Sequence, residues 1–446
     1  MIETAQAAPR RALFVATILT GSFLLFLVQP MVARMALPRL GGAPNVWNSA
    51  MLVYQALLLA GYGYAHRLGR MPLRRQAKVH VALLLLSAVT LPIALVHLPP
   101  PAPGWEAVWV PLLLALSIGP VFLLVSAQAP LMQRWYAAEP SAGEPWALYA
   151  ASNLGSFAGL IAYPLAAEPL FGIAQQSWAW TAGYALLIGL VILAARARWR
   201  ADALPEQSFE AAAERVPARR ILLWLALSAV PSGLMLSTTT HLTTDLFAMP
   251  LLWVIPLGLY LLSFVVAFAE ARGLCRLVTA LALPVVLLAG GHAMTSASGG
   301  TLVPAFASVG LLFVVCVALH GRLYDVRPPA AQLTLFYFVM SAGGVLGGLF
   351  TALIAPLVFD WVWEHPLLVL AAAALLPHVA RLDWRGLPGQ SPEMARFGAA
   401  VLAVTVGLLG WGLAEMTANG TPGLSAFALT IVAAAFGTLL APWRWL

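Results

Sequence analysis

The sequence predicts an all-α polytopic membrane protein with about fourteen transmembrane helices. Three observations support this prediction: the composition, the length of the apolar segments and the distribution of basic residues. Hydrophobic residues make up 61% of the 446 residues and charged residues 9%, against about 45–50% and about 25% in soluble domains. The 24 basic and 17 acidic side chains are too few to cover a soluble protein of this length. The composition therefore excludes a soluble globular fold, a disordered chain, a secreted disulfide scaffold and a nucleic-acid-binding domain.

The apolar segments give the number of spans. A helix needs about 20 mostly apolar residues to cross about 30 Å of hydrocarbon. The first segment follows a short polar N-terminus and has no small-residue cleavage site after it, so we expect it to be retained. The predicted spans are residues 12–30, 46–65, 79–97, 108–130, 146–166, 177–195, 220–238, 249–268, 276–293, 303–320, 332–356, 366–381, 397–414 and 424–442.

Basic residues orient these spans. If the N-terminus is cytoplasmic, 22 of the 24 basic residues fall in cytoplasmic segments, and only Arg34 and Arg39 lie outside. Such a bias follows the positive-inside rule, and one miscounted helix would destroy it. We therefore expect both termini in the cytoplasm and anionic lipid headgroups as the partner of the basic face.

An internal repeat relates two groups of six spans. Since each group has an even number of spans, the two repeats share one orientation, which is the arrangement of the major facilitator architecture. The expected parts are a first repeat over 1–195, a cytoplasmic linker over 196–220, a second repeat over 221–381 and two additional helices over 382–446. The matches are Pro44, Trp47 and Tyr54 with Pro250, Trp253 and Tyr260 (offset 206), Arg134, Tyr136 and Tyr149 with Arg322, Tyr324 and Tyr337 (offset 188), and Ser152, Gly155 and Gly159 with Ser341, Gly344 and Gly348 (offset 189).

Several motifs resemble the membrane module of the bacterial fused major facilitator/spermidine synthase-like family. They are Gln29-Pro30-Met31, Leu37 to Gly42, Val46-Trp47-Asn48, Gly61 to His66, Leu148 to Ser156, and Thr240 to Asp245 followed by Pro250 to Trp253. The resemblance covers about residues 12–380 and implies an inner-membrane location, with a polyamine-related solute or a soluble synthase-like partner.

The chain departs from that family after its twelfth span. A soluble aminopropyltransferase-like domain commonly follows there, whereas this sequence continues into two further predicted spans. No glycine-rich turn between a strand and a helix marks a nucleotide site. We therefore expect no enzymatic activity.

Ionisable and polar residues near the outer membrane surface are the candidate functional site, because such groups are costly at a membrane. At offset 206, Asp245 corresponds to Arg39, and corresponding loops approach each other across the axis of a parallel repeat. One interpretation is a substrate site, with Asp245 and His241 facing a cation or proton; the other is a latch that pairs arginine with aspartate across the two halves. The candidate substrate-binding or gating residues are Gln29, Arg34, Arg39, Asn48, His241 and Asp245.

Amide side chains inside spans either line a cavity or bond neighbouring helices; they are Asn48, Gln55, Gln128 and Asn153. The eight histidines lack the i, i+4 spacing of a metal pair within one span, so we expect neither a metal nor a cofactor.

These observations favour a transporter-like protein that moves a small polar or cationic solute by alternating access. The alternative is a non-transporting membrane partner or anchor of a separately encoded spermidine-synthase-like enzyme. Every acidic residue lies near a predicted membrane boundary, which argues against proton coupling through a carboxylate deep within a span.

Overall fold

The computed structural model describes residues 2–40, 44–99, 101, 106–137, 145–199, 216–245, 252–294, 303–360, 362–377 and 393. All regular structure in these residues is helical. The predicted all-α class is therefore confirmed for the part of the chain that the structure describes.

The N-terminal half contains six helical passages, some of them interrupted. Two of these passages contain a break: α4 is followed directly by α5, and α6 continues through a π-helical segment into α7. The elements are α1 (Ile2–Leu40), α2 (Pro44–Leu68), α3 (Leu73–Ser87), η1 (Ala88–Thr90), α4 (Glu106–Ser126), α5 (Gln128–Ala137), α6 (Trp146–Ala162), η2 (Tyr163–Ala167), α7 (Glu168–Leu170) and α8 (Ile173–Trp199).

The C-terminal half repeats this pattern with six further passages in the described residues. The fifth passage, α13, again runs through a π-helical segment into a short final helix. The elements are α9 (Ala218–Asp245), α10 (Val254–Phe268), α11 (Gly273–Met294), α12 (Val303–Asp325), η3 (Ala330–Gln332), α13 (Leu333–Leu349), η4 (Phe350–Ile354), α14 (Ala355–Val358) and α15 (Glu364–Leu375).

Each passage overlaps one of the first twelve predicted spans; the third differs most, because its helices cover 73–90 whereas the predicted span was 79–97. Six helices in the described residues are long and apolar enough to cross a membrane by length and composition. The last two predicted spans, 397–414 and 424–442, lie outside the described residues, so the count of fourteen stays a prediction. The domain boundaries stay predictions as well; α9 begins at Ala218, inside the predicted linker.

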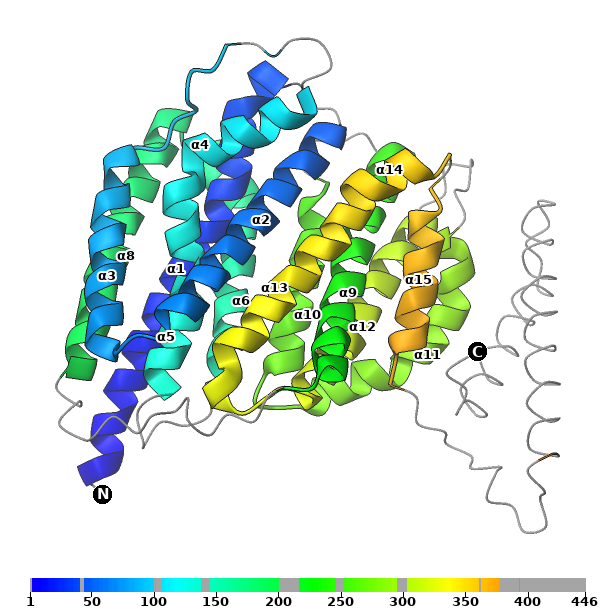
Figure 1. Ribbon diagram of the computed structural model, residues 1–446. Coiled ribbons are helices and arrows are strands. Elements are labelled where there is room, and N and C mark those ends of the chain that lie inside the picture. The colour runs from blue at the N-terminus through cyan, green and yellow to red at the C-terminus, as the bar shows by residue number, and fades with distance from the viewer. Residues whose placement is uncertain are drawn as a thin grey trace.

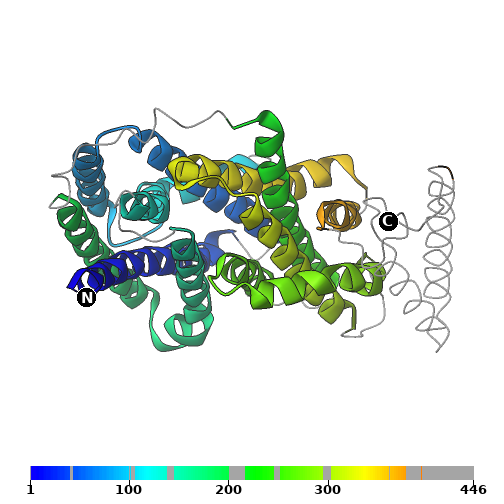
Figure 2. The same ribbon diagram turned by 90° about the horizontal axis from the view of Figure 1, so that it is seen from below.

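The two halves stand side by side, as the colours from blue to green and from green to orange show in Figures 1 and 2. Successive passages alternate in direction, so loops alternate between the two ends of the bundle. The last turns of α2, α5 and α12 carry Arg67, Arg134 and Arg322, and all three turns lie at the lower end in Figure 1. We call this the basic end.

Glycines place the same helix pairs in close contact in both halves. A Cβ on Gly155 or Gly159 of α6 would lie 2.7 or 2.3 Å from a carbonyl oxygen of α1, and a Cβ on Gly343 or Gly347 of α13 would lie 2.7 or 2.2 Å from one of α9. Only glycine permits such an approach of two backbones. The equivalent glycines are thus 188 residues apart (343 minus 155), so the predicted match to Gly344 at offset 189 was wrong by one residue.

The π-helical segments fall within one residue of the same equivalence, since they begin 187 residues apart (350 minus 163). One covers Tyr163–Ala167 and the other Phe350–Ile354, and each directly follows the glycine-packed helix of its half. A π segment is a rare interruption of an α-helix. Its occurrence at corresponding places shows that the repeat extends to the backbone geometry.

Candidate functional site

A cavity lies between the two halves, and the space enclosed by its lining, counted together with the open solvent at its mouth, is about 1060 Å³. Helices α1, α2, α4, α5 and α6 line it from the N-terminal half, and α9, α10 and α13 line it from the C-terminal half. Aromatic and aliphatic side chains form much of the wall, and hydroxyl and amide groups are distributed among them. The polar lining consists of Ser22, Gln29, Tyr54, Gln55, Tyr62, Ser126, Tyr149, Ser152, Asn153, Ser156, Ser232, Tyr260 and Ser341. No described lining residue carries a charge.

Hydrogen bonds join the lining groups to each other and to backbone. Ser22 and Ser152 share one with 2.8 Å between their oxygens, and Gln55 Nε2 donates across the two halves to Ser232 Oγ at 3.3 Å. The Asn153 amide donates to the Tyr149 carbonyl at 2.9 Å. These bonds hold the polar groups in place in an otherwise apolar wall.

Two lining atoms have hydrogen-bonding capacity left over. Gln55 Oε1 and Ser341 Oγ are buried and make no hydrogen bond within the described structure. Buried polar atoms are rarely left unsatisfied, because each costs about 1–3 kcal/mol. Both residues line the cavity, so a polar molecule in the cavity is the simplest partner for their unused atoms.

A cluster of aromatic rings, which we call the plug, separates the cavity from the basic end. The rings of Tyr149 and Tyr337 stack with centroids 4.8 Å apart and planes 20° apart. Tyr62 approaches Tyr337 at 6.3 Å, and Trp146 meets Phe336 edge to face at 5.5 Å. Because Tyr149 and Tyr337 are equivalent in the two repeats, their contact places both rings on the axis that relates the halves.

Polar contacts between the halves reinforce the plug. The Tyr337 hydroxyl donates to Gln133 Oε1 at 2.6 Å, and His66 Nδ1 lies 3.0 Å from Thr334 Oγ1. Nearer to the surface, Arg11 pairs with Glu270 at 2.5 Å. These described contacts join the two halves between the cavity and the basic end.

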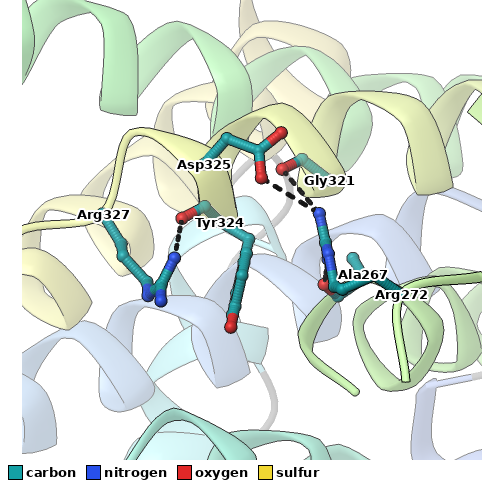
Figure 3. Close-up of polar contacts among 6 residues, drawn as sticks. All are labelled: Ala267, Arg272, Gly321, Tyr324, Asp325 and Arg327. Atoms are coloured by element: carbon teal, nitrogen blue, oxygen red, sulfur yellow. Dashed lines mark hydrogen bonds and ion pairs between the residues drawn. The ribbon is translucent and has the colours of Figure 1, made fainter. Parts of the chain in front are cut away.

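An arginine–tyrosine–arginine stack stabilises the basic end of the C-terminal half (Figure 3). The guanidinium groups of Arg272 and Arg327 lie 4.2 and 3.8 Å from the centroid of the Tyr324 ring, and Arg272 also pairs with Asp325 at 3.1 Å. Arg327 additionally lies 5.8 Å from the ring centroid of Trp146 in the other half. The stack thus ties the end of α12 to the plug.

The predicted outer cluster is divided among several places. Gln29 lines the cavity. Arg34 pairs with Glu168 at 3.1 Å, and Arg39 donates to the Val96 carbonyl at 3.1 Å, so the described partners of both arginines lie within their own half. His241 stacks on His365 of α15, with centroids 5.5 Å apart.

The other members of that cluster cannot be placed. The side chains of Asn48 and Asp245 lie outside the described residues. Pairing of arginine with Asp245 across the two halves therefore stays a prediction.

The alternatives for the intramembrane amides are resolved in different ways. Gln55 and Asn153 line the cavity, whereas Gln128 lies beside His80, whose Nε2–H donates to Gln128 Oε1 at 2.9 Å. The plug was not among the functional elements predicted from the sequence. A signal for it was present in the sequence, because the repeat matches Tyr149 with Tyr337.

No protein-family model matches the chain, and no curated protein matches it. Solved structures do match. A double-tryptophan mutant of XylE has a TM-score of 0.52 at 14% identity, with 83% of this chain and 97% of that chain covered. A D-xylose–proton symporter structure has a TM-score of 0.50 at 14% identity, covering 82% and 97%. The fold is of the major facilitator type.

At 14% identity the likeness to these two structures concerns the fold alone, and it confirms the predicted major facilitator architecture. A structure described as the major facilitator superfamily proton:xylose symporter XylE also matches, with a TM-score of 0.49 at 12% identity, covering 86% of this chain and 97% of that one.

Proposed function

We propose that this protein moves a small, neutral, polar solute across the membrane by alternating access. The observation that carries the proposal is the uncharged, hydrogen-bonding cavity between two pseudo-symmetric halves. Major facilitator halves rock around such a central site. The plug closes the basic end in this state, and an opposite state would open it.

The lining favours a neutral solute over a cation. Transfer of an ion out of water costs several kcal/mol unless an opposite charge offsets it, and the described lining provides no carboxylate. A polyamine carries several positive charges, so it fits this wall poorly. Hydroxyl or amide groups on a neutral solute would instead bond the unused atoms Gln55 Oε1 and Ser341 Oγ.

The outer cluster keeps a role in this proposal. Gln29 would contact the solute directly, since it lines the cavity. Arg34, Arg39, Asn48, His241 and Asp245 would form the gate at the end opposite the plug. The positive-inside rule assigns the basic end to the cytoplasm, with both termini there, in an inner membrane.

Access to one cavity residue from both sides tests the proposal without knowledge of the solute. The experiment places Ser341→Cys in a background with Cys275→Ser and Cys316→Ser, in right-side-out and inside-out vesicles. A small membrane-impermeant thiol reagent should reach this residue from both sides. Ser308→Cys is the control, because Ser308 is buried in α12 away from the cavity lining and should react from neither side. Access from one side only would contradict alternating access.

A binding experiment separates the solute classes. We expect D-xylose, as a neutral probe, to raise the melting temperature of the purified protein more than spermidine does. Gln55→Leu should remove the effect. If spermidine stabilises the protein and Gln55→Leu abolishes that stabilisation, the solute is cationic and the neutral assignment is wrong.

The rival function is a membrane anchor for a soluble spermidine-synthase-like enzyme, and the sequence motifs support it. It predicts access to Ser341→Cys from one side or from none, and a stable complex with such an enzyme. The same labelling experiment therefore decides between transporter and anchor.

A further inference from the structure

One layer of aromatic side chains separates His320 of α12 from the cavity and from the plug. It is fully buried, and its ring stacks on Phe264 with centroids 3.5 Å apart. Tyr260 meets the same imidazole edge to face at 5.3 Å, and both aromatic rings line the cavity. Phe264 also contacts Tyr149 of the plug at 5.5 Å.

The hydrogen bonds of Ser263 fix the tautomer of His320. Ser263 Oγ donates its single proton to the Tyr260 carbonyl at 2.6 Å, so the oxygen must accept from His320 Nδ1–H at 2.9 Å. Nε2 therefore carries a lone pair. This nitrogen is buried and has no hydrogen-bond partner in the structure.

His80 of α3 shows that this fold does satisfy a buried histidine elsewhere. It is as deeply buried as His320. Its Nε2–H donates to Gln128 Oε1 at 2.9 Å, and its Nδ1 accepts from the Tyr64 hydroxyl at 3.2 Å. His320 thus keeps an unused acceptor where the equally buried His80 has none, and an unsatisfied buried atom of this kind points to a ligand.

The surroundings keep His320 neutral while the plug is closed. Helices α9, α10, α11 and α15 pack against α12, and the titratable group of α10 that contacts the ring is Tyr260, a neutral phenol. The charged groups lie toward helix ends: Arg322 of α12 donates to the Leu375 carbonyl, Arg272 directly precedes α11, and Glu364 is the first residue of α15. The free energy of moving an imidazolium from water into this interior is larger than the cation–π stabilisation that contacts with two aromatic rings provide.

We propose that Nε2 of His320 is a proton-binding site that couples opening of the plug to pH, which rests on the alternating access proposed above. When the plug opens, water reaches the ring and Nε2 takes a proton from it. Closure returns the proton to water. A proton that binds the open state better shifts the equilibrium toward that state, so acid favours opening, by at most about tenfold per pH unit for one site.

The labelling rate of Ser341→Cys from the basic side measures this opening. The rate is divided by that of the denatured protein at the same pH, which removes the pH dependence of the thiol reaction. We expect the normalised rate to rise at least about threefold from pH 7.5 to pH 5.5. His320→Asn should make it independent of pH, since the asparagine amide can replace Nδ1–H as the donor to Ser263 but offers no Nε2.

Two matched variants exclude the other histidines. His80→Asn tests the satisfied buried histidine, and His66→Asn tests the histidine that bonds Thr334 within the contacts around the plug. Both should keep the pH response. The proposal is overturned if the wild-type rate is flat, if the response survives in His320→Asn, or if it disappears in His66→Asn.

Nitrogen-15 NMR of histidine in the wild-type protein provides a test that needs no variant at position 320. At pH 7.5 one imidazole should be the neutral, Nδ1-protonated tautomer, and at pH 5.5 it should become imidazolium only when the plug is held open. An imidazolium signal from this residue in the closed protein would contradict the proposal. If Ser341→Cys reacts from both sides but with no pH dependence, transport stands and this inference fails.

Discussion

The two halves of the molecule are alike in backbone packing and unlike in polar chemistry. In both, a pair of glycines brings the fifth passage onto the first, and a π segment follows. The buried histidines differ: His80 in the N-terminal half uses both ring nitrogens, whereas His320 in the C-terminal half uses one.

This difference shows which features a repeat preserves. Contacts between backbones leave no room for a side chain, so both copies must keep glycine to retain the helix arrangement. A polar side chain is constrained only by its own partners. His80 lies in the third passage of its half and His320 in the fourth passage of its own, so the polar groups of the two halves differ in position as well as in partners.

The largest expected effect tests the packing that the halves share. Gly159→Ala and Gly347→Ala should each lower stability by about 1–3 kcal/mol or more, because the new Cβ would lie 2.3 or 2.2 Å from a carbonyl oxygen of the facing helix. The melting temperature in detergent measures the loss.

Gly189→Ala is the matched control, because nothing lies within 4 Å of its Cβ position. It should be neutral or slightly stabilising, since alanine favours a helix over glycine by about 0.5–1 kcal/mol. If only one of the two packing variants is destabilised, the halves differ in backbone packing as well as in polar chemistry.

The next effect tests the polar difference. His80→Leu strands Gln128 Oε1 and the Tyr64 hydroxyl, at about 1–3 kcal/mol for a buried group left unpaired. His320→Leu leaves Ser263 still donating to a carbonyl and removes an unsatisfied nitrogen. We expect His80→Leu to have the lower melting temperature of the two, and equal losses would mean that His320 has a partner after all.

The fold was largely predictable because a membrane enforces regular apolar segments. Pro44, Trp47 and Tyr54 matched their repeat mates by residue type alone, and the structure places Tyr54 and Tyr260 on the wall of one cavity. The one-residue error at Gly344 arose since two adjacent glycines, Gly343 and Gly344, look alike in a sequence. Only the distance to α9 distinguishes them.

The cavity was less predictable because its described lining carries no charge, whereas most of the candidate residues were chosen for being ionisable. Arg34 and Arg39 attract attention as ionisable groups at a membrane, yet their described contacts hold loops of their own half. The cavity is instead built from serine, tyrosine and amide side chains, which are common in helix packing. Their convergence on one cavity depends on how the two halves meet, and no segment of the sequence encodes that by itself.

A smaller effect tests the axis between the halves. A double-mutant cycle of Tyr149→Leu and Tyr337→Leu should give a coupling of about 0.5–1.5 kcal/mol in the stability of the protein. The labelling of Ser341→Cys from the basic side should also increase. The stacked pair Trp180 and Tyr184, 5.4 Å apart within one half, is the control. Its disruption should lower stability without changing the labelling, whereas strictly additive losses at the plug would show that the two rings act separately.

The smallest effect distinguishes an ion pair between the halves from one inside a half. Arg11–Glu270 joins the halves and has side chains 51% and 68% exposed, so solvent screens it and it contributes only about 0–1 kcal/mol. Arg34–Glu168, 39% and 33% exposed, joins parts of one half.

Arg11→Gln should leave the melting temperature nearly unchanged. It should increase labelling of Ser341→Cys from the basic side by a few fold at most, because about 0.8 kcal/mol corresponds to a factor of four. High salt should produce the same increase in the wild type. Arg34→Gln should not affect that labelling at all. If Arg34→Gln does change the labelling, a contact at the outer end of α1 influences the plug through the length of the helix. Coupling between the halves would then extend beyond their direct contacts.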